Sequence, residues 1–450
     1  MIIHPDDNVE VRADGHKYAR CPIAAGENVI KYGMPIGHAT RDIASGEHVH
    51  TENIATNLSG KIEYNYTPDY REIPVNCTRT FQGFRRPDGQ IGIRNDIWII
   101  PTVGCVNSLA RRLADTTGAI ALTHPYGCSQ LGDDHENTAN LLAALAHNPN
   151  AGGVLVLGLG CENNTMQSFR ERLGDISKLN LRFLVAQEVE DELEESLRLV
   201  AELQAARIDH REEVPLSELR VGLKCGGSDG FSGITANPLV GRFSDWLVAQ
   251  GGTAVLTEVP EMFGAEALLM NRCIDRQVFD RCVQMVNGFK EYFQRHGQVI
   301  YENPSPGNKA GGISTLEDKS LGCVQKGGTA PVMDVLPYTA RLTRHGLNLM
   351  TAPGNDMVSA TALAAAGCQM ILFTTGRGTP FGTVVPTVKI ATNTPLATRK
   401  PHWIDWDAMA QPNELCLAER IIQIASGDTL AQNELHANQD IAIFKDGVTL

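Results

Sequence analysis

Four short hydrophobic runs along the chain each end beside a cysteine that has glycine next to it. The runs cover residues 97–103, 120–126, 154–159 and 219–224, and the cysteines that follow them are Cys105, Cys128, Cys161 and Cys225. Short apolar runs bounded by glycine are typical of buried parallel strands. Ligands of open α/β sheets bind at the carboxyl ends of such strands, so the pattern predicts that the four thiols converge on one sheet edge.

Segments with helical periodicity separate these runs. The pattern predicts helices over residues 108–116 and 190–207, one that ends at His147 and one that begins after Cys161. Beyond a polar boundary at 208–217 the alternation repeats, with strands near residues 219, 254, 347, 370 and 388 and helices over 238–250, 276–296, 332–344 and 356–366. Alternating strands and helices predict βαβ units and parallel sheets.

The first 57 residues have a different pattern. Residues 23–29 (Ile-Ala-Ala-Gly-Glu-Asn-Val) recur as residues 43–49 (Ile-Ala-Ser-Gly-Glu-His-Val), which predicts a small, turn-rich β module with two similar halves. His48 and His50 alternate on one face of a strand, a spacing that suits a metal or an anionic ligand, and exposure on an edge strand is the alternative. The predicted organisation is a β module at 1–57, a linker at 58–80, and α/β domains at 81–215 and 216–450.

Composition and charge exclude several classes of function. The 450 residues are 42% hydrophobic, and no apolar run approaches the roughly 20 residues that span a bilayer. The first residues are acidic and lack the regions of a signal peptide, so we expect a cytoplasmic protein without membrane partners. Lys and Arg number 39 against 52 Asp and Glu, and this net charge of −13 argues against nucleic acid as a partner. A small anionic substrate is still allowed, because a pocket can be locally positive.

Eleven cysteines, an odd number, make a poor disulfide framework and fit metal binding or small-residue packing better. Thiolates favour soft metals, and three of them can hold an iron–sulfur cluster whose remaining iron is free to bind substrate. Zinc is an alternative, although the chain has no tight Cys-x-x-Cys pair. Asp133, Asp134 and His135 offer another ligand set for a single divalent ion beside Cys128.

Polar, glycine-rich loops follow several strands of the last domain. They contain Ser228, Asp229, Asn308, Lys309 and Arg377, and the Arg377 guanidinium can bind a carboxylate at two points. Each loop could instead be a turn or a helix cap, but together they predict a polar pocket for a hydroxylated acid. Residues 158–160 begin like a dinucleotide fingerprint, yet Asn163 replaces the third glycine, so a nicotinamide site is weakly signalled.

Several long strings are specific enough to indicate a family. They cover residues 16–19, 29–33, 126–135, 158–164, 225–230, 233–238, 302–312 and 443–450. These strings closely resemble the altronate/galactarate dehydratase family, and the resemblance extends over essentially the whole chain. It implies an α/β protein in which a small SAF-type β-clip domain precedes parallel-sheet Rossmann-like domains that bind no nucleotide. It also implies a second domain that can mediate dimerisation, so we expect a homodimer.

The resemblance further implies an iron-dependent hydro-lyase that removes water from a hexonate or hexarate. D-Altronate, which would give 2-dehydro-3-deoxy-D-gluconate, is the expected substrate, and galactarate or another aldarate is the alternative. We expect iron, as mononuclear Fe²⁺ or an iron–sulfur cluster, on Cys105, Cys128 and Cys161, with Cys225 as a spare ligand.

The elimination also needs an acid, a base and a group that binds the carboxylate. We expect His16, His48 or His50 as acid or base, and Arg377 and Lys309 at the carboxylate. The competing hypotheses are a nicotinamide-dependent oxidoreductase and a binding module on a catalytically inactive scaffold.

Overall fold

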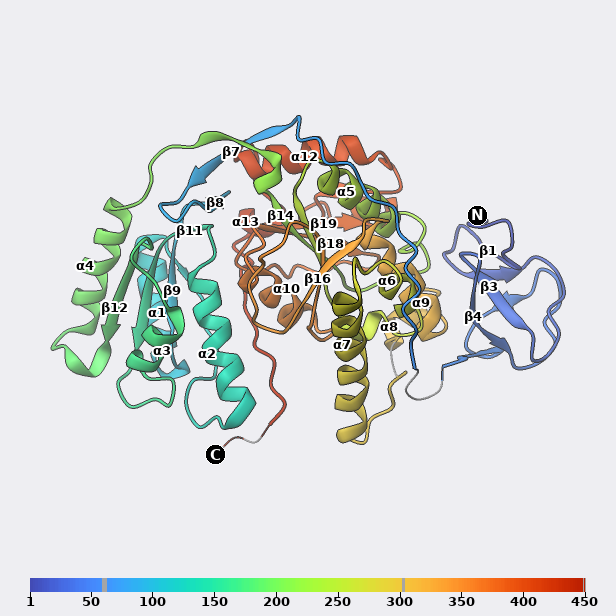
Figure 1. Cartoon of the computed structure of the whole chain (residues 1–450), viewed down its shortest axis with the longest axis horizontal. Coiled ribbons are helices and arrows are strands. Elements are labelled where there is room, and N and C mark those ends of the chain that lie inside the picture. Colours follow the sequence, from blue (N-terminus) through green and yellow to red (C-terminus); the bar gives the residue numbers. More distant parts are fainter. Residues whose placement is uncertain (59–62, 302–303, 448, 450) are drawn as a thin grey trace.

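The computed structural model describes residues 1–58, 63–301, 304–447 and 449. Figure 1 shows three parts side by side: a small β domain that contains the N-terminus, a central domain that contains most of the last half of the chain, and a second α/β domain on the far side. The C-terminal tail runs down between the last two parts. Among the described residues, no helix has the length and apolar character needed to cross a membrane.

The N-terminal domain consists of two three-stranded antiparallel sheets. One has the order β1 (Val9–Val11), β2 (Lys17–Ala19), β5 (His48–Val49), and the other β3 (Asn28–Lys31), β4 (Met34–Ala39), β6 (Ile54–Ala55). The two repeated segments meet where Ile23 and Ile43 exchange backbone hydrogen bonds of 3.0 and 2.9 Å. In both repeats the glutamate accepts a 2.9 Å bond from the amide three residues earlier, so the repeated sequence forms a repeated turn.

The predicted linker region runs along the central domain. Between residues 63 and 79 it has no regular helix or strand, and residues 59–62 lie outside the described residues. The hydroxyl of Tyr66 donates to the carbonyl of Cys273 at 2.7 Å, and Lys290 donates to the hydroxyl of Tyr64 at 2.9 Å. The segment is therefore packed against the central domain on its way to β7 (Thr80–Arg85).

The second domain is built on a four-stranded parallel sheet. Its order is β10 (Ile120–Ala121), β9 (Asp96–Pro101), β11 (Ala151–Gly158), β12 (Leu181–Val185). The helices are α1 (Asn107–Thr117), α2 (Gly132–Ala146), α3 (Met166–Leu173) and α4 (Glu192–Ala205). A small antiparallel sheet of β13 (Glu212–Pro215), β7 and β8 (Ile91–Gly92) lies beside it. A turn at Asp88-Gly89 joins β7 to β8.

The central domain contains a seven-stranded parallel sheet. Its order is β16 (Val332–Leu336), β17 (Gly346–Met350), β15 (Thr253–Leu256), β14 (Arg220–Cys225), β18 (Met370–Thr375), β19 (Thr387–Ala391), β20 (Trp406–Asp407). The helices are α5 (Ala236–Ala249), α6 (Glu266–Met270), α7 (Arg276–Arg295), α8 (Pro306–Ala310), α9 (Leu316–Cys323), α10 (Asp356–Ala365), α11 (Thr394–Arg399), α12 (Glu414–Ser426) and α13 (Gln432–Leu435).

The strand order places a topological switch in the middle of this sheet. From β14 the chain first builds the side that contains β15, and it later returns to place β18 on the other side of β14. Loops at the carboxyl ends of β14 and β18 therefore diverge and leave a crevice, where open α/β sheets bind their ligands. The fold is thus the predicted α/β architecture.

Two predictions about the elements are wrong. The segment 332–344 was expected to be a helix, but it begins with the edge strand β16, because Pro331 and Pro337 bracket a five-residue run that a helix could not extend. The four cysteine-terminated strands were expected to share one edge. The strands β9, β10 and β11 do, but β14 belongs to the other sheet.

Candidate active site

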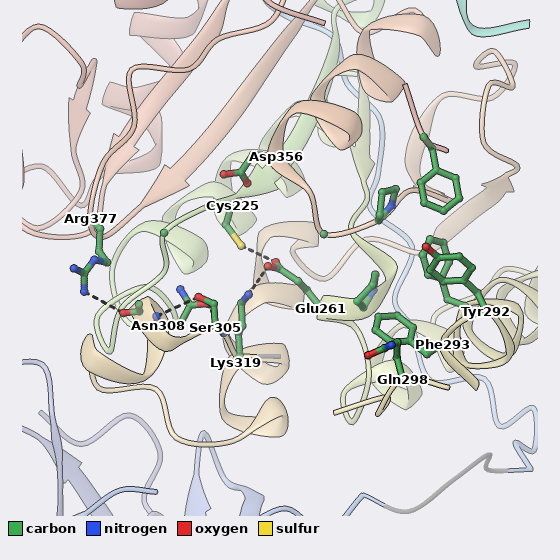
Figure 2. A pocket seen from close by; sticks show the side chains of 18 of the residues that line it. Cys225, Glu261, Tyr292, Phe293, Gln298, Ser305, Asn308, Lys319, Asp356 and Arg377 are labelled. Carbon is green, nitrogen blue, oxygen red and sulfur yellow. Dashed lines mark hydrogen bonds and ion pairs between the residues drawn. The ribbon is translucent and has the colours of Figure 1, made fainter. Parts of the chain in front are cut away.

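The switch point opens into a cavity of about 550 Å³ (Figure 2). Cys225 and Gly226 reach it from the end of β14, Glu261 from the loop after β15, Asp356 from the start of α10, and Arg377 from the loop after β18. Ser305, Asn308 and Lys319 complete its polar part. Gly376 permits the close approach of the Arg377 loop, because a Cβ there would lie 2.2 Å from Cγ of Asp229.

A buried cluster of thiols and charged groups forms the floor of this cavity. The Sγ atom of Cys225 lies 3.4 Å from Sγ of Cys323, 2.8 Å from Oε2 of Glu261 and 2.8 Å from Nζ of Lys326. Lys319 forms a 2.7 Å ion pair with the other carboxylate oxygen of Glu261. The end of β14, the turn after β15 and the α9 region therefore bring together groups up to 101 residues apart in the sequence.

The protonation states of this cluster follow from its contacts. The hydrogen bond from Cys323 lowers the pKa of the Cys225 thiol to about 7 despite burial, and the Lys326 ammonium acts in the same direction. The pKa of Cys323 rises well above its usual value, because it donates that bond and is buried. Burial alone would raise the pKa of Glu261, but the ammonium groups of Lys319 and Lys326 lower it to about 2. Cys225 is therefore the thiol of this pair that ionises near neutral pH.

Glu258 contacts the backbone that carries this cluster. Its backbone adopts the left-handed conformation (φ 70°), which is unusual for a residue other than glycine. Its carboxyl group accepts a 2.9 Å bond from the amide of Cys225 and lies 3.1 Å from Nζ of Lys224. Burial and the charge of Glu261 raise its pKa well above the usual range. The strained turn thus fixes the backbone from which Cys225 projects.

The cluster contains a donor set for a metal ion. Ligand atoms of Cys225, Cys323 and Glu261 all lie within 4.8 Å of one another, and all three residues are buried. Two sulfurs and one carboxylate oxygen suit a soft or borderline divalent ion and leave coordination positions for substrate. Lys326 contacts the sulfur of Cys225 and Lys319 the carboxylate of Glu261, so the site also balances these negative charges through ammonium groups. This triad is compatible with a metal.

Comparison with known proteins shows the family to which the chain belongs. Three family models match consecutive parts of the chain: "Altronate/galactarate dehydratase SAF domain" at residues 2–57, "D-galactarate dehydratase/Altronate hydrolase, second domain" at 83–207, and "D-galactarate/Altronate dehydratase, C-terminal" at 216–449. The chain belongs to the altronate/galactarate dehydratase family.

Relatives within this family are similar over nearly their full length. The altronate dehydratase of Bacillus subtilis (strain 168) is 56% identical across 98% of this chain and 94% of its own. The altronate dehydratase of Escherichia coli (strain K12) is 55% identical across 97% and 92%. The galactarate dehydratase (L-threo-forming) of Escherichia coli (strain K12) is 33% identical across 88% and 80%.

The predicted substrate-binding residues of this dehydratase-family chain lie in different places. Arg377 and Asn308 line the cavity, and the side chain of Asn308 also donates to the carbonyl of Ser228 at 2.9 Å, so Ser228 supports the wall from behind. Lys309 is half-buried on α8 and is not a lining residue of this cavity. Arg377 is held by a 3.1 Å bond from its Nη1 to the carbonyl of Gly307.

A second cavity, of about 450 Å³, lies between the N-terminal and central domains. Arg377 lines it as well, together with Asp229, Arg399 and the Asp14–Gly15 turn that precedes His16. The carboxylate of Asp229 accepts 3.0 Å hydrogen bonds from Thr392 and Asn393, and these bonds hold the side chain in place. Arg377 thus stands between the first cavity and the β-clip domain.

The predicted histidines do come together in the β-clip. Nδ1 of His16 lies 3.1 Å from Nε2 of His48, and the ring centroid of His50 lies 5.7 and 5.4 Å from those of His16 and His48. Nδ1 of His50 is buried and has no hydrogen-bond partner within the described part of the chain. Burial lowers the pKa of both His16 and His50, and neighbouring cationic groups lower it further. Neither of the two cavities has these histidines among its lining residues.

Three predicted metal ligands lie in the second domain instead. Cys105, Cys128 and Cys161 are exposed on neighbouring loops at the carboxyl edge of its sheet. These loops are joined by backbone bonds from Gly104 to Tyr126 (2.8 Å) and from Asn164 to Gly127 (3.0 Å). Among the described residues, the three thiols are not grouped within 4.8 Å as the Cys225 triad is. The four predicted ligands therefore do not form one site.

At two other predicted sites, candidate binding groups already form hydrogen bonds with other parts of the protein. The amides of Leu159 and Gly160, which would face a pyrophosphate, donate to the buried carboxylate of Glu162 at 3.0 and 2.6 Å. The buried carboxylate of Asp134 accepts the amides of Asp446 and Gly447 at 2.7 and 2.8 Å. The amides of the predicted nicotinamide site and the Asp134 carboxylate of the Asp133, Asp134 and His135 ligand set are therefore already engaged by protein groups.

Sequence patterns alone assign no role to several important residues of this cluster. Glu261, Lys319, Cys323 and Lys326 lie in segments that read as ordinary turns and helix. The available signal was the position of Glu261 between Pro260 and Met262, where an unpaired charge would be costly.

Proposed function

We propose that this protein removes water from a sugar acid, with D-altronate as the first substrate and 2-dehydro-3-deoxy-D-gluconate as the product. Galactarate or another aldarate is the second candidate. The observation that carries the proposal is the cavity at the switch point, which places the guanidinium of Arg377 in the same 550 Å³ space as the thiol and carboxylate cluster around Cys225. The near-full-length similarity to proteins named altronate dehydratase supports the choice of substrate.

The reaction sets three requirements. The C2–H bond breaks and its electron pair forms the C2=C3 double bond, while the C3–O bond breaks and the hydroxyl leaves with a proton as water. The resulting enol then tautomerises to the 2-keto acid. A cation must stabilise the negative charge that develops on the carboxylate, and Arg377 can bind both of its oxygens. A base must take the C2 proton, and an acid must protonate the departing hydroxyl.

We assign iron, as Fe²⁺, to Cys225, Cys323 and Glu261, because their donor atoms fit a soft or borderline divalent ion. Bound there, the ion would supply Lewis-acid polarisation of a substrate oxygen. Lys319 would hold the Glu261 carboxylate in position, and Lys326 would offset the thiolate charge. An iron–sulfur cluster on Cys105, Cys128 and Cys161 is the alternative, supported by their position on adjoining loops of one sheet edge.

Two variants distinguish these iron sites. After anaerobic reconstitution with iron, the protein should release the 2-keto acid from D-altronate. Cys323→Ser should lower both bound iron and turnover at least tenfold, whereas Cys161→Ser, a matched change of an exposed cysteine, should leave both near the unmodified level. Iron content is measured by metal analysis and product by a 2-keto-acid assay. The reverse pattern would move the iron to the second domain, and absence of product from any sugar acid would remove the proposed function.

We further propose that the histidine trio supplies the acid or base. Its support is the 3.1 Å contact between His16 and His48 and the lowered pKa of His16 and His50, which keeps both neutral, and so able to accept a proton, near pH 7. Activity should therefore persist as pH falls through 6.5 and decline only below it, when these rings gain a proton.

His48→Ala should lower kcat without lowering iron content, and it should change this acidic limb of the kcat profile. His210→Ala, a change at an exposed histidine outside the β-clip domain, serves as the control. An unchanged profile in His48→Ala would place the histidines outside the reaction.

The family resemblance supports two broader proposals, a homodimer formed through the second domain and a cytoplasmic location. Light scattering coupled to size-exclusion chromatography tests the first, and fractionation of the source cells tests the second.

A further inference from the structure

The cavity has two chemically different ends (Figure 2). Arg377, Asn308, Ser305 and Cys225 gather at one end, and aromatic rings gather at the other. The aromatic side chains are Phe289, Tyr292 and Phe293 of α7 and Phe444 of the C-terminal tail. A sugar acid whose carboxylate binds Arg377 would therefore extend its far end toward an aromatic wall.

The C-terminal tail completes this wall. The ring of Phe444 lies 5.5 Å from that of Tyr292 and 6.4 Å from that of Phe289, measured between centroids. Hydrogen bonds hold the tail at this ring and just beyond it. The amide of Phe444 donates to the hydroxyl of Tyr338 at 3.0 Å, and the carboxylate of Asp134 accepts hydrogen bonds from the amides of Asp446 and Gly447. The wall is thus built from two segments that are more than 140 residues apart in the sequence.

The tail also pairs with basic side chains at the aromatic end. The carboxylate of Asp446 accepts hydrogen bonds from both Arg295 and His296, at the end of α7. His296 is a lining residue of the cavity. A second carboxylate on the substrate would compete with Asp446 for these groups, and it would lose its hydration against Phe293 and Phe444.

We propose that the C-terminal tail, through Phe444 and Asp446, makes this cavity selective for sugar acids with a single carboxylate. An aldonate presents a hydroxymethyl group to the aromatic end, and that group buries at little cost. An aldarate presents a second carboxylate there, but Arg295 is already paired with Asp446. The site therefore discriminates against aldarates through an unfavourable interaction. The inference rests on the proposed function and names the substrate class of that site.

The test is the ratio of kcat/KM for galactarate to kcat/KM for D-altronate. Asp446→Asn frees Arg295 and His296 but keeps the backbone amide that binds Asp134, and it should raise the ratio about tenfold, the effect of one charge-assisted contact. Phe444→Lys, which places an ammonium group at the aromatic end, should raise it by a similar factor. The controls are Asp440→Asn, at an exposed position of the same tail, and Phe444→Leu, which keeps the wall apolar.

An unchanged ratio in both Asp446→Asn and Phe444→Lys would overturn the inference, as would an equal rise in the controls. Calorimetric Kd values for the two acids give the same ratio in any folded variant that has lost turnover. If the unmodified protein dehydrates neither acid, the proposed function fails. The selectivity is tested separately by the ratio of the Kd for galactarate to the Kd for D-altronate. If Asp446→Asn and Phe444→Lys leave this ratio unchanged, the selectivity is refuted.

Discussion

Arg377 lines both cavities, so its guanidinium could bind a substrate carboxylate from either side. Arg399 lines only the second cavity, and this difference lets kinetics identify the binding site. Arg377→Gln should raise KM for D-altronate about 10- to 100-fold, the cost of a lost charge-assisted bond. Arg399→Gln should leave KM within about twofold, since the proposed substrate lies in the first cavity. A large rise in KM for Arg399→Gln alone would place the substrate between the domains.

At this scale, the sequence predicted the residues that stand directly after strands. Cys225 ends β14 and Arg377 follows β18, so the rule that ligands bind at carboxyl ends of strands was enough to find them. Glu261 and Cys323 reach the same site from 36 and 98 residues beyond Cys225. Their contact depends on how the loop after β15 and α9 pack over the sheet, which no local pattern encodes.

Among the structural elements, α9 fixes the β-clip domain to the central domain. The carboxylate of Asp318 on α9 accepts bonds from Lys17 of β2 at 2.7 Å and Lys31 of β3 at 2.9 Å, and all three groups are buried. Burial opposes ionisation of Asp318, but the two ammonium groups keep its pKa far below the usual value. The stability that this carboxylate contributes is therefore present at neutral pH and is lost only as pH falls below the ordinary carboxyl range.

Asp318→Asn leaves two buried ammonium groups without a counter-ion, and it should lower the free energy of unfolding by about 3–5 kcal/mol. Denaturant unfolding measures the change, and faster proteolysis within the 63–79 segment would show that the β-clip has lost its attachment. Glu195→Gln, which breaks an exposed ion pair with Arg198, is the matched control and should have no measurable effect. Equal effects from both changes would show that the buried contacts do not hold the domain.

Periodicity predicted most helices and strands within a few residues, and it failed at β16. The run 332–336 is short and apolar except for Asp334, a pattern that does not separate a buried strand from a helix. The flanking prolines and the neighbouring strand β17 decide the outcome. The repeated β-clip turns were predictable for the opposite reason, because each turn is closed by a glutamate within its own repeat.

At the scale of the whole molecule, the site depends on parts that are distant in sequence. The C-terminal tail passes from the central domain to α2 of the second domain and supplies Phe444 to the cavity on its way (Figure 1). The β-clip approaches the same region through the cavity that it shares with Arg377. The sequence predicted three domains but not their arrangement. The contacts between them, such as the buried core that Leu141 of α2 shares with Leu363 of α10, join residues far apart in the sequence and follow no local pattern.

The most direct test of the account is a crystal structure of the protein with bound iron and an aldonate that it does not dehydrate. We expect density for the sugar acid in the switch-point cavity, with its carboxylate on Arg377, its far end against Phe444, and iron on Cys225, Cys323 and Glu261. Density for the acid in the second cavity, or beside Cys105, Cys128 and Cys161, would contradict it.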